Sequence, residues 1–580
     1  DSVFLTPTLK RSSPMKRSLL SAALALALCG GATLAHADIT LQPVGRYQGE
    51  NTRFASGAAE IVAYDKGTRR IFVVNAQDGT VDVLNATDPS NLVKVGQIDA
   101  RAAGDSLGAA NSVAVRNGLV AVAIEADPVT APGLIAFYDA STLELLRTVP
   151  AGALPDAVTF SNTGHFVMAV NEGEPRDGVD PEGSITIVDL RERGRRKPAF
   201  SSCTADFRAF NAQREALVAA GVVIDPRAQS VAQDLEPEYA VAVGNNAYVT
   251  LQENNAIAVV QLEQCRVKRI VPLGFKDHGR PENALDTSDR DFNGGNGNGR
   301  ILLRSWANLY GVYQPDSIGA YEAADGQTYL VIANEGDARD AQEARVGSLN
   351  LDADAFPNPA TVRANANLGR LTVNKSLGCK VPLDANGNCA VYDSLFAYGA
   401  RSFSILTNDG RMVFDSANDF ERIIAGKVLA GELPPQAFNA NHSSNSAGAI
   451  PGQSTDTFDS RSDDKGPEPE GVVVGRVGDR TYAFVGLERI GGVMIYDVTD
   501  PANAFYVDYV NHRDFRAPVC TEVNANGTCK NGTPNPAALD LGAEGLAFVS
   551  ADDSPSGKPL VIVGNEVSGS TTVFEVVPKR

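Results

Sequence analysis

The chain has 580 residues, of which 43% are hydrophobic, and its 70 acidic against 51 basic residues give a formal net charge of −19. Such a surplus of carboxylates repels the phosphate backbone, which excludes nucleic acid as a partner class. Beyond the N-terminal segment no apolar run approaches the roughly 20 residues that cross a bilayer, so we expect no membrane span. We also expect a monomer.

The first 37 residues have the features of a targeting segment. Met15–Arg17 precede the apolar run Leu19–Leu28, and Ala35–Ala37 provide the small residues of a cleavage site. We therefore predict a signal peptide within residues 1–37 and one domain over residues 38–580. The mature protein is expected in the periplasm or outside the cell.

Seven units with the same order of strands follow one another along the rest of the chain. Each opens with a short β-branched strand, turns into a second apolar strand that runs into an acidic or amide residue, and adds a third strand. The third unit is the clearest, with strands at Asp156–Phe160, His165–Glu172 and Ser184–Asp189. The first and second strands of the others are predicted at Glu60–Tyr64 with Ile71–Asn75, Ser112–Val115 with Leu119–Glu125, Tyr239–Val243 with Ala247–Glu253, Asp316–Tyr321 with Thr328–Glu335, Gly471–Val474 with Thr481–Glu488, and Glu544–Val549 with Pro559–Glu566.

Units this small cannot bury both faces of a sheet alone, so they are expected to stack around an axis. We predict an all-β, seven-bladed β-propeller with long loop insertions on one face. Six or eight blades and a β-sandwich are the alternatives. The last unit ends after its third strand, Thr571–Val576, and we predict that Ile39–Tyr47 supplies its outer strand, which would leave no open edge.

Acidic residues recur where first strands begin and second strands end, and antiparallel pairing puts both positions on one face. Like charges crowded at one mouth of the channel raise one another's pKa unless a cation intervenes. Oxygen-only ligands favour Ca²⁺, with Mg²⁺ as the alternative ion. Simple capping of strand ends is the competing interpretation. Glu60, Glu125 and Glu253 are acidic positions of this mouth that are not among the candidate ligands. The candidate metal-ligating carboxylates are Asp156, Glu172, Glu238, Asp316, Glu335, Asp337, Glu470, Glu488, Glu544 and Glu566.

Four long insertions are expected on the same face, at residues 191–235, 275–313, 338–399 and 420–467. The second carries closely spaced oxygen donors on a glycine-rich stretch and resembles a calcium loop. It departs from the EF-hand pattern because it lacks a glutamate at the twelfth position and flanking helices, so a flexible polar loop is the alternative. Its candidate ligands are Asp286, Asp289, Asp291 and Asn293.

Four basic residues near the acidic positions are candidates for binding a small anionic ligand. His442, Arg461 and Lys465 lie in the last insertion, and Arg339 follows the second strand of the fifth unit. Guanidinium and ammonium groups are common partners of phosphate and carboxylate. A solvated, salt-bridged loop is the alternative.

Six cysteines follow the predicted leader, an even number that is typical of disulfides in an oxidising compartment. Two pairs flank Gly/Asn turns that bring their ends together, and the third pair follows by elimination. Thiolate metal sites are disfavoured because no Cys-x-x-Cys occurs. The predicted disulfides join Cys379 to Cys389, Cys520 to Cys529, and Cys203 to Cys265.

Several longer strings resemble the choice-of-anchor I family, and the resemblance extends over residues 40–577. They are Gln314–Ile318, Ala333–Arg339, Gly399–Ile405, Phe458–Gly471 and Gly564–Gly569. The resemblance implies an exported or surface propeller, similar in form to the YVTN and esterase-like phytase propellers. Its members include mesenchyme-surface-glycoprotein-like proteins and are often labelled alkaline phosphatase-like. Members commonly carry a C-terminal sorting anchor that this chain lacks, so a periplasmic or released protein is expected rather than a tethered one.

Two functions are consistent with these observations. The first is a ligand-binding or surface-interaction propeller with a Ca²⁺-binding acidic face. The alternative is a metal-dependent phosphoesterase, alkaline phosphatase-like or phytase-like, in which cations neutralise phosphate and activate water. No Gly-x-Ser-x-Gly, Walker loop or His-Glu-x-x-His motif occurs. We favour binding because no nucleophile or base can be singled out, and whether the chain is an enzyme is left open.

Overall fold

The computed structural model describes residues 38–579, except 192–199, 293–298, 340–341, 385–386, 443–456, 523–528 and 530–531. The predicted signal peptide and Asn293 lie outside the described residues. Asp38–Arg580 form one compact unit. Within the described residues, we find no helix with the length and hydrophobicity needed to cross a membrane.

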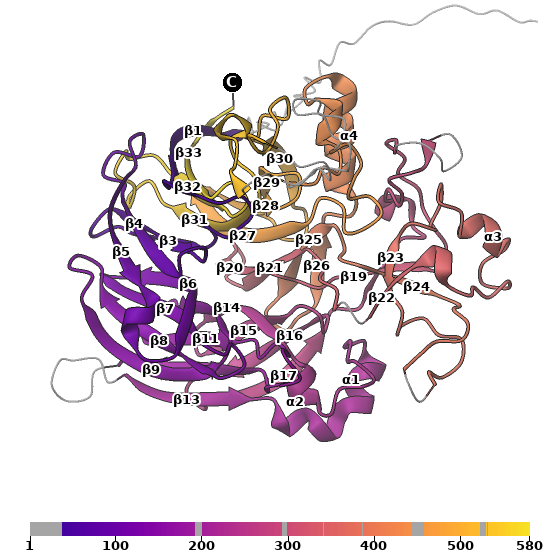
Figure 1. Cartoon of the computed structure of the whole chain (residues 1–580), viewed down its shortest axis with the longest axis horizontal. Coiled ribbons are helices and arrows are strands. Elements are labelled where there is room, and N and C mark those ends of the chain that lie inside the picture. Colours follow the sequence, from indigo (N-terminus) through magenta and orange to yellow (C-terminus); the bar gives the residue numbers. More distant parts are fainter. Residues whose placement is uncertain are drawn as a thin grey trace, which may run out of the picture. The chain divides into compact units, whose positions relative to one another are not determined.

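Strands dominate the structure, and the first half of the chain forms four antiparallel four-stranded sheets (Figure 1). The first contains β2 (Val62–Asp65), β3 (Arg70–Asn75), β4 (Thr80–Asn85) and β5 (Val93–Asp99); the second β6 (Leu107–Arg116), β7 (Leu119–Ala126), β8 (Pro132–Asp139) and β9 (Leu145–Ala153); the third β10 (Pro155–Phe160), β11 (Phe166–Asn171), β12 (Ser184–Asp189) and β13 (Ser201–Asp206); the fourth β14 (Pro237–Val243), β15 (Asn246–Leu251), β16 (Ala256–Gln261) and β17 (Arg266–Pro272).

Three further four-stranded sheets complete the repeat. The fifth contains β20 (Ile318–Glu322), β21 (Thr328–Asn334), β25 (Ser402–Thr407) and β26 (Met412–Asp415); the sixth β27 (Pro469–Val477), β28 (Arg480–Leu487), β29 (Val493–Asp497) and β30 (Phe505–Val510); the seventh β31 (Ala543–Val549), β32 (Leu560–Asn565), β33 (Ser570–Pro578) and β1 (Ile39–Gln48). The predicted outer strand of this sheet is present, because β1 pairs antiparallel with β33, from Ile39 opposite Pro578 to Gln48 opposite Ser570.

The second strands are apolar on both faces because each sheet packs against a neighbour on either side. In β11, Phe166, Met168 and Val170 are buried in one cluster with Val249 and Ala258 of the fourth sheet. The first strands contact one another in the cyclic order β2, β6, β10, β14, β20, β27, β31 and again β2. This radial packing is that of a β-propeller and not of the two-layered β-sandwich.

A five-stranded sheet that the sequence did not predict lies outside this repeat. It combines the insertions 275–313 and 338–399, since β19 and β24 pair in parallel with Leu309 opposite Leu395. Its strands are too short to have a recognisable periodicity, and they pair only across long separations. They are β18 (Phe275–Asp277), β19 (Leu309–Val312), β22 (Glu343–Arg345), β23 (Thr372–Asn374) and β24 (Leu395–Tyr398).

The helices and 3₁₀ turns named below are short, and most of them lie in the insertions. In α4, Phe420 and Ile424 are buried with Phe403 of β25 and Tyr496 of β29, and the helix ends at Gly431, whose φ of 76° favours glycine. The helices are α1 (Arg214–Ala220), α2 (Val231–Asp234), α3 (Pro359–Val362) and α4 (Asp419–Ala430), with 3₁₀ turns at Ala100–Ala103, Arg208–Gln213, Pro281–Asn283, Val346–Ser348, Pro435–Ala437 and Pro536–Ala538.

All three predicted disulfides are formed, which fits an oxidising compartment. Cys203 lies on β13 at the edge of the third sheet, and its partner Cys265 lies in the turn between β16 and β17 of the fourth. This bridge therefore joins two neighbouring sheets, whereas the other two each close a single loop.

Replacing Cys203 and Cys265 with serine is expected to lower the free energy of unfolding by about 2–4 kcal/mol, because the bridge restricts the unfolded chain. Thermal unfolding under non-reducing conditions measures the effect. The matched control replaces Cys379 and Cys389, which are 10 residues apart instead of 62, and should lose less. A larger loss in the control would contradict the expectation.

Candidate functional site

Irregularities at the start of the first strands position four of the predicted carboxylates. The strand register shifts between Pro155 and Ala157, and equivalent shifts occur at the start of β14, β27 and β31. A β-bulge re-aims the side chain that it contains. The acidic residues at these four bulges are Asp156, Glu238, Glu470 and Glu544.

The remaining carboxylates of the set lie close to the strand ends, as predicted. Glu60 and Asp316 each precede a first strand by two residues. Glu125 lies in β7, one residue before its end. The acidic residues that follow second strands are Glu172, Glu253, Glu335, Glu488 and Glu566.

Three of these carboxylates form a compact group. Glu60, Glu544 and Glu566 each offer an oxygen, and these oxygens all lie within 4.8 Å of one another. Burial, followed by the charge of Glu566, raises the pKa of Glu60 to about 8. Burial also raises the pKa of Glu544 far above its usual value, and Glu60 and Glu566 are the neighbouring charges that add most to this shift. The group is therefore one that a cation would stabilise.

The acidic region continues around the first strands. Four further carboxylic acids have a pKa well above the ordinary value, because they are buried and because the charged groups that shift their pKa are all acidic. They are Glu172, Glu238, Asp316 and Glu470. Burial and then Glu125 raise the pKa of Asp156 to about 6. Among the described residues, buried oxygens of Glu253, Glu470 and Glu544 have no hydrogen-bond partner.

Beside the fifth and sixth sheets, three basic side chains form ion pairs with Glu468. This glutamate is fully buried and lies 2.6 Å from Arg461, 3.0 Å from Arg489 and 3.2 Å from Lys465. Lys465 also lies 2.8 Å from Glu335. This half of the site is therefore neutralised internally, whereas in the group around Glu544 only Glu566 has its pKa lowered by a basic neighbour, Arg489, against the stronger effect of burial.

The four anion-binding candidates all face carboxylates. Arg461 and Lys465 pair with Glu468, and Arg339 lies 3.0 Å from both Asp234 and Glu236. His442 Nε2 lies 2.9 Å from Glu488, and burial lowers the pKa of His442. Asp337 is half-exposed, with an oxygen 3.7 Å from Lys465 Nζ. The structure thus brings these basic residues to the acidic face, where their charges are paired with carboxylates of the protein itself.

Sequence reasoning did not select Glu468 or Arg489. Glu468 lies two residues before the predicted ligand Glu470, and Arg489 directly follows Glu488. A charge search around each predicted carboxylate would have found both residues. The β27–β28 hairpin brings the two together, because Pro469 lies opposite Leu487 and the Glu488 amide donates to the Glu468 carbonyl.

The three described carboxylates of the calcium-like loop have other partners. Asp289 accepts hydrogen bonds from Arg370, and Asp291 accepts one from Arg300. The Asp286 carboxylate accepts a hydrogen bond of 2.6 Å from the Leu302 amide. Among the described residues, none of these three belongs to a group of three metal-ligand atoms within 4.8 Å. These contacts are those of a loop fixed by ion pairs and a backbone hydrogen bond, and Asn293, the fourth predicted ligand, lies outside the described residues.

Comparison with known proteins agrees with the resemblance of the sequence. The model of the choice-of-anchor I domain matches residues 60–501. The chain belongs to the choice-of-anchor I family. Gigasin-3a of Magallana gigas is 27% identical over 217 residues, covering 37% of this chain and 67% of that protein. The mesenchyme-specific cell surface glycoprotein of Strongylocentrotus purpuratus is 28% identical over 263 residues, covering 40% of this chain and 31% of that protein.

Solved structures similar to this choice-of-anchor I protein include hydrazine synthase of Kuenenia stuttgartiensis, with 11% identity and a TM-score of 0.41 over 92% of this chain and 99% of that one. The RRP9 WD40 repeats give 9% identity and a TM-score of 0.42 over 93% of this chain and 100% of that one.

Proposed function

We propose that the chain is an exported, seven-bladed β-propeller that binds Ca²⁺ at its acidic face and uses this face to bind a ligand or a surface partner. The seven four-stranded sheets and the cyclic contacts of their first strands support the blade number. The disulfides support export, and so does the likeness to a cell surface glycoprotein.

The group formed by Glu60, Glu544 and Glu566 carries the proposal of a bound cation. Three carboxylate oxygens within 4.8 Å provide hard oxygen ligands of the kind that Ca²⁺ prefers. Only carboxylates contribute charge to the raised pKa values of Glu60 and Glu544, and one buried oxygen of Glu544 has no hydrogen-bond partner. Mg²⁺ is less suited, because it demands near-ideal octahedral geometry and keeps several waters.

A bound cation gives the acidic face a function that the carboxylates alone lack. It offsets the negative potential at the mouth and offers coordination positions to an oxygen of an approaching ligand. Of the described basic residues, Arg461, Lys465, Arg489 and Arg339 are held in ion pairs. We therefore assign ligand contact to the cation rather than to these side chains.

The phosphoesterase alternative needs a basic group that is free to hold phosphate beside the metal. All four residues that the sequence offered for this role are paired with carboxylates. The geometry therefore favours binding over phosphate hydrolysis.

Thermal unfolding in EDTA, Ca²⁺ and Mg²⁺ tests the proposal. Ca²⁺ is expected to raise the melting temperature, with a stabilisation of about 2.7 kcal/mol at a hundredfold excess over its Kd. The double variant Glu60→Gln/Glu544→Gln should melt higher than the parent in EDTA, since like charges are removed, and should not respond to Ca²⁺.

The matched control is Glu144→Gln, an exposed carboxylate in the turn after β8, which should keep the full Ca²⁺ response. The same samples are assayed with an aryl phosphate and with phytate. Metal-dependent phosphate release that is lost in the double variant would replace the binding function with the phosphoesterase. A melting temperature unaffected by Ca²⁺ would reject the cation site.

A further inference from the structure

A pocket of about 460 Å³ lies between the seventh and the first sheet, and its lining does not include Glu60, Glu544 or Glu566. Its lining comes from β1 and β33 of one sheet, from β3, β4 and β5 of the other, and from the loops that follow β1 and β3. The pocket is therefore created by the pairing of β1 with the last sheet. Its volume suits a small ligand, since such sites commonly enclose about 300–1,000 Å³.

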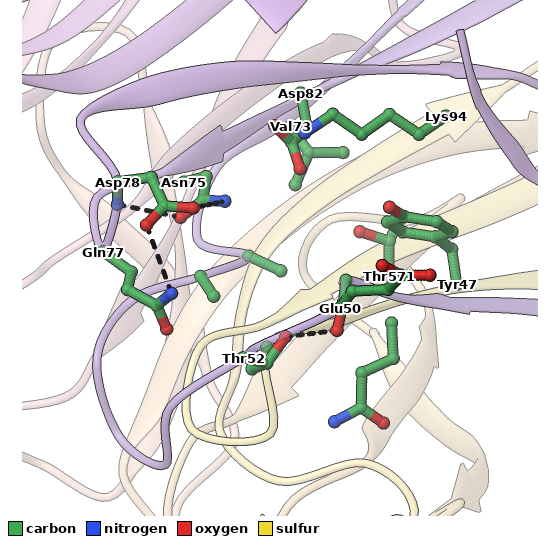
Figure 2. Close-up of a pocket in the computed structure, with 15 residues that line it drawn as sticks. Tyr47, Glu50, Thr52, Val73, Asn75, Gln77, Asp78, Asp82, Lys94 and Thr571 are labelled. Carbon is green, nitrogen blue, oxygen red and sulfur yellow. Dashed lines mark hydrogen bonds and ion pairs between the residues drawn. The ribbon is translucent and has the colours of Figure 1, made fainter. Parts of the chain in front are cut away.

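The walls are polar and face one another across the space. Figure 2 shows Asn75, Gln77 and Asp78 on one side, and Tyr47 and Thr571 on the other. Long hydrogen bonds join the amides to Asp78, at 3.4 Å from Asn75 and 3.3 Å from Gln77. Amide, hydroxyl and carboxylate groups in this arrangement match ligand hydroxyls, which both donate and accept hydrogen bonds.

The charge of the lining selects against anions. Lys94 is its one basic residue, and Lys94 Nζ already lies 2.7 Å from Asp82. Glu50 and Asp78 add two carboxylates, and neither has an ion-pair partner in the described part of the chain. Burial, followed by the charges of Asp82 and Glu50, raises the pKa of Tyr47, so its hydroxyl stays protonated and can donate a hydrogen bond. A ligand that brings a positive charge is therefore favoured.

We propose that this pocket binds a small polyhydroxylated ligand that carries an amino group, the chemistry of an amino sugar. Its ammonium group pairs with the exposed Glu50, its hydroxyls bond to Asn75, Gln77 and Asp78, and the C–H face of its ring packs against Tyr47. The pocket shares no lining residue with the Glu60, Glu544 and Glu566 group, and its occupation would also stabilise the packing of the seventh sheet against the first.

Titration of the full chain with glucosamine, glucose and glucuronate, followed by calorimetry in EDTA, tests this proposal. Because EDTA removes Ca²⁺, failure of the cation site does not affect the result. Glucosamine should bind saturably, glucose more weakly, and glucuronate not measurably. Absence of saturable glucosamine binding, or equal binding of all three, would overturn the proposal.

Two variants locate the binding. Glu50→Gln changes an exposed side chain and should fold normally, and it is expected to weaken glucosamine binding about fivefold while leaving glucose binding unchanged. Tyr47→Ala should weaken the binding of both sugars. The matched control Glu144→Gln should alter neither. Unchanged glucosamine binding by Glu50→Gln would show that the ammonium group is not recognised here, which would contradict the proposal.

Discussion

Replacing Glu468 with glutamine is expected to lower the free energy of unfolding by about 3–5 kcal/mol, the cost of leaving buried charges without their partner. Three basic groups converge on this fully buried carboxylate, at 2.6 Å from Arg461, 3.0 Å from Arg489 and 3.2 Å from Lys465. Burial alone would raise the pKa of Glu468, but these three cations hold it well below its usual value. The carboxylate is therefore charged at neutral pH, and an amide cannot replace its charge.

The matched control for this variant is Asp464→Asn, in the same loop. Asp464 lies 3.0 Å from Arg461, but it is partly exposed, so its loss is expected to cost no more than about 1 kcal/mol. Both variants are compared with the parent by thermal unfolding in Ca²⁺. If Glu468→Gln destabilises the protein no more than Asp464→Asn does, the buried charge cluster does not have the structural role assigned to it.

Asp540→Asn is expected to destabilise the protein by about 3 kcal/mol by weakening the attachment of β1. Asp540 is buried, and its Oδ1 accepts a hydrogen bond from Arg46 Nε of β1 at 2.7 Å. Its Oδ2 accepts from the Thr572 hydroxyl of β33 at 2.7 Å and lies 2.8 Å from His512 Nδ1. Burial would raise the pKa of Asp540, but His512 and Arg46 lower it to about 2.

The effect of Asp540→Asn should depend on pH. The folded pKa of about 2 lies below the ordinary value of 3.8, so the carboxylate stabilises the fold above about pH 4 and loses this contribution as the pH falls towards 2. The difference in melting temperature between parent and variant should be largest near pH 7 and shrink between pH 4 and pH 2. A difference that does not change with pH would contradict this account. Asp508→Asn, at the less buried pair with Lys579, is the control and should show a smaller loss at neutral pH.

The four-stranded sheets and the outer strand β1 were predictable because their signals are local. Each second strand is a run of β-branched and aromatic residues after a tight turn, as in Phe166–Asn171 and Leu560–Asn565. The missing outer strand followed from counting, and β1 occupies this place. The position of the carboxylates was predictable too, because antiparallel pairing places the start of each first strand and the end of each second strand on the same face.

The five-stranded sheet and the pairing of charges were not predictable from local pattern. Leu309 of β19 pairs with Leu395 of β24, and the β20–β21 hairpin of the fifth sheet lies between them in the sequence. Strands of three or four residues are also too short to show a periodic pattern. The sequence left open whether Arg461 and Lys465 bind an anion or form salt bridges, and in the structure both pair with Glu468. Long-range packing decided which basic residues are neutralised.

The central claim is that a cation binds between Glu60, Glu544 and Glu566, and the most direct measurement is anomalous scattering from crystals grown with Ca²⁺. The account predicts an anomalous peak in contact with oxygens of these three residues, and no such peak in crystals of Glu60→Gln/Glu544→Gln. Crystals that contain Ca²⁺ but show no peak at this group would contradict it, and so would a peak confined to the loop that carries Asp286 and Asp291.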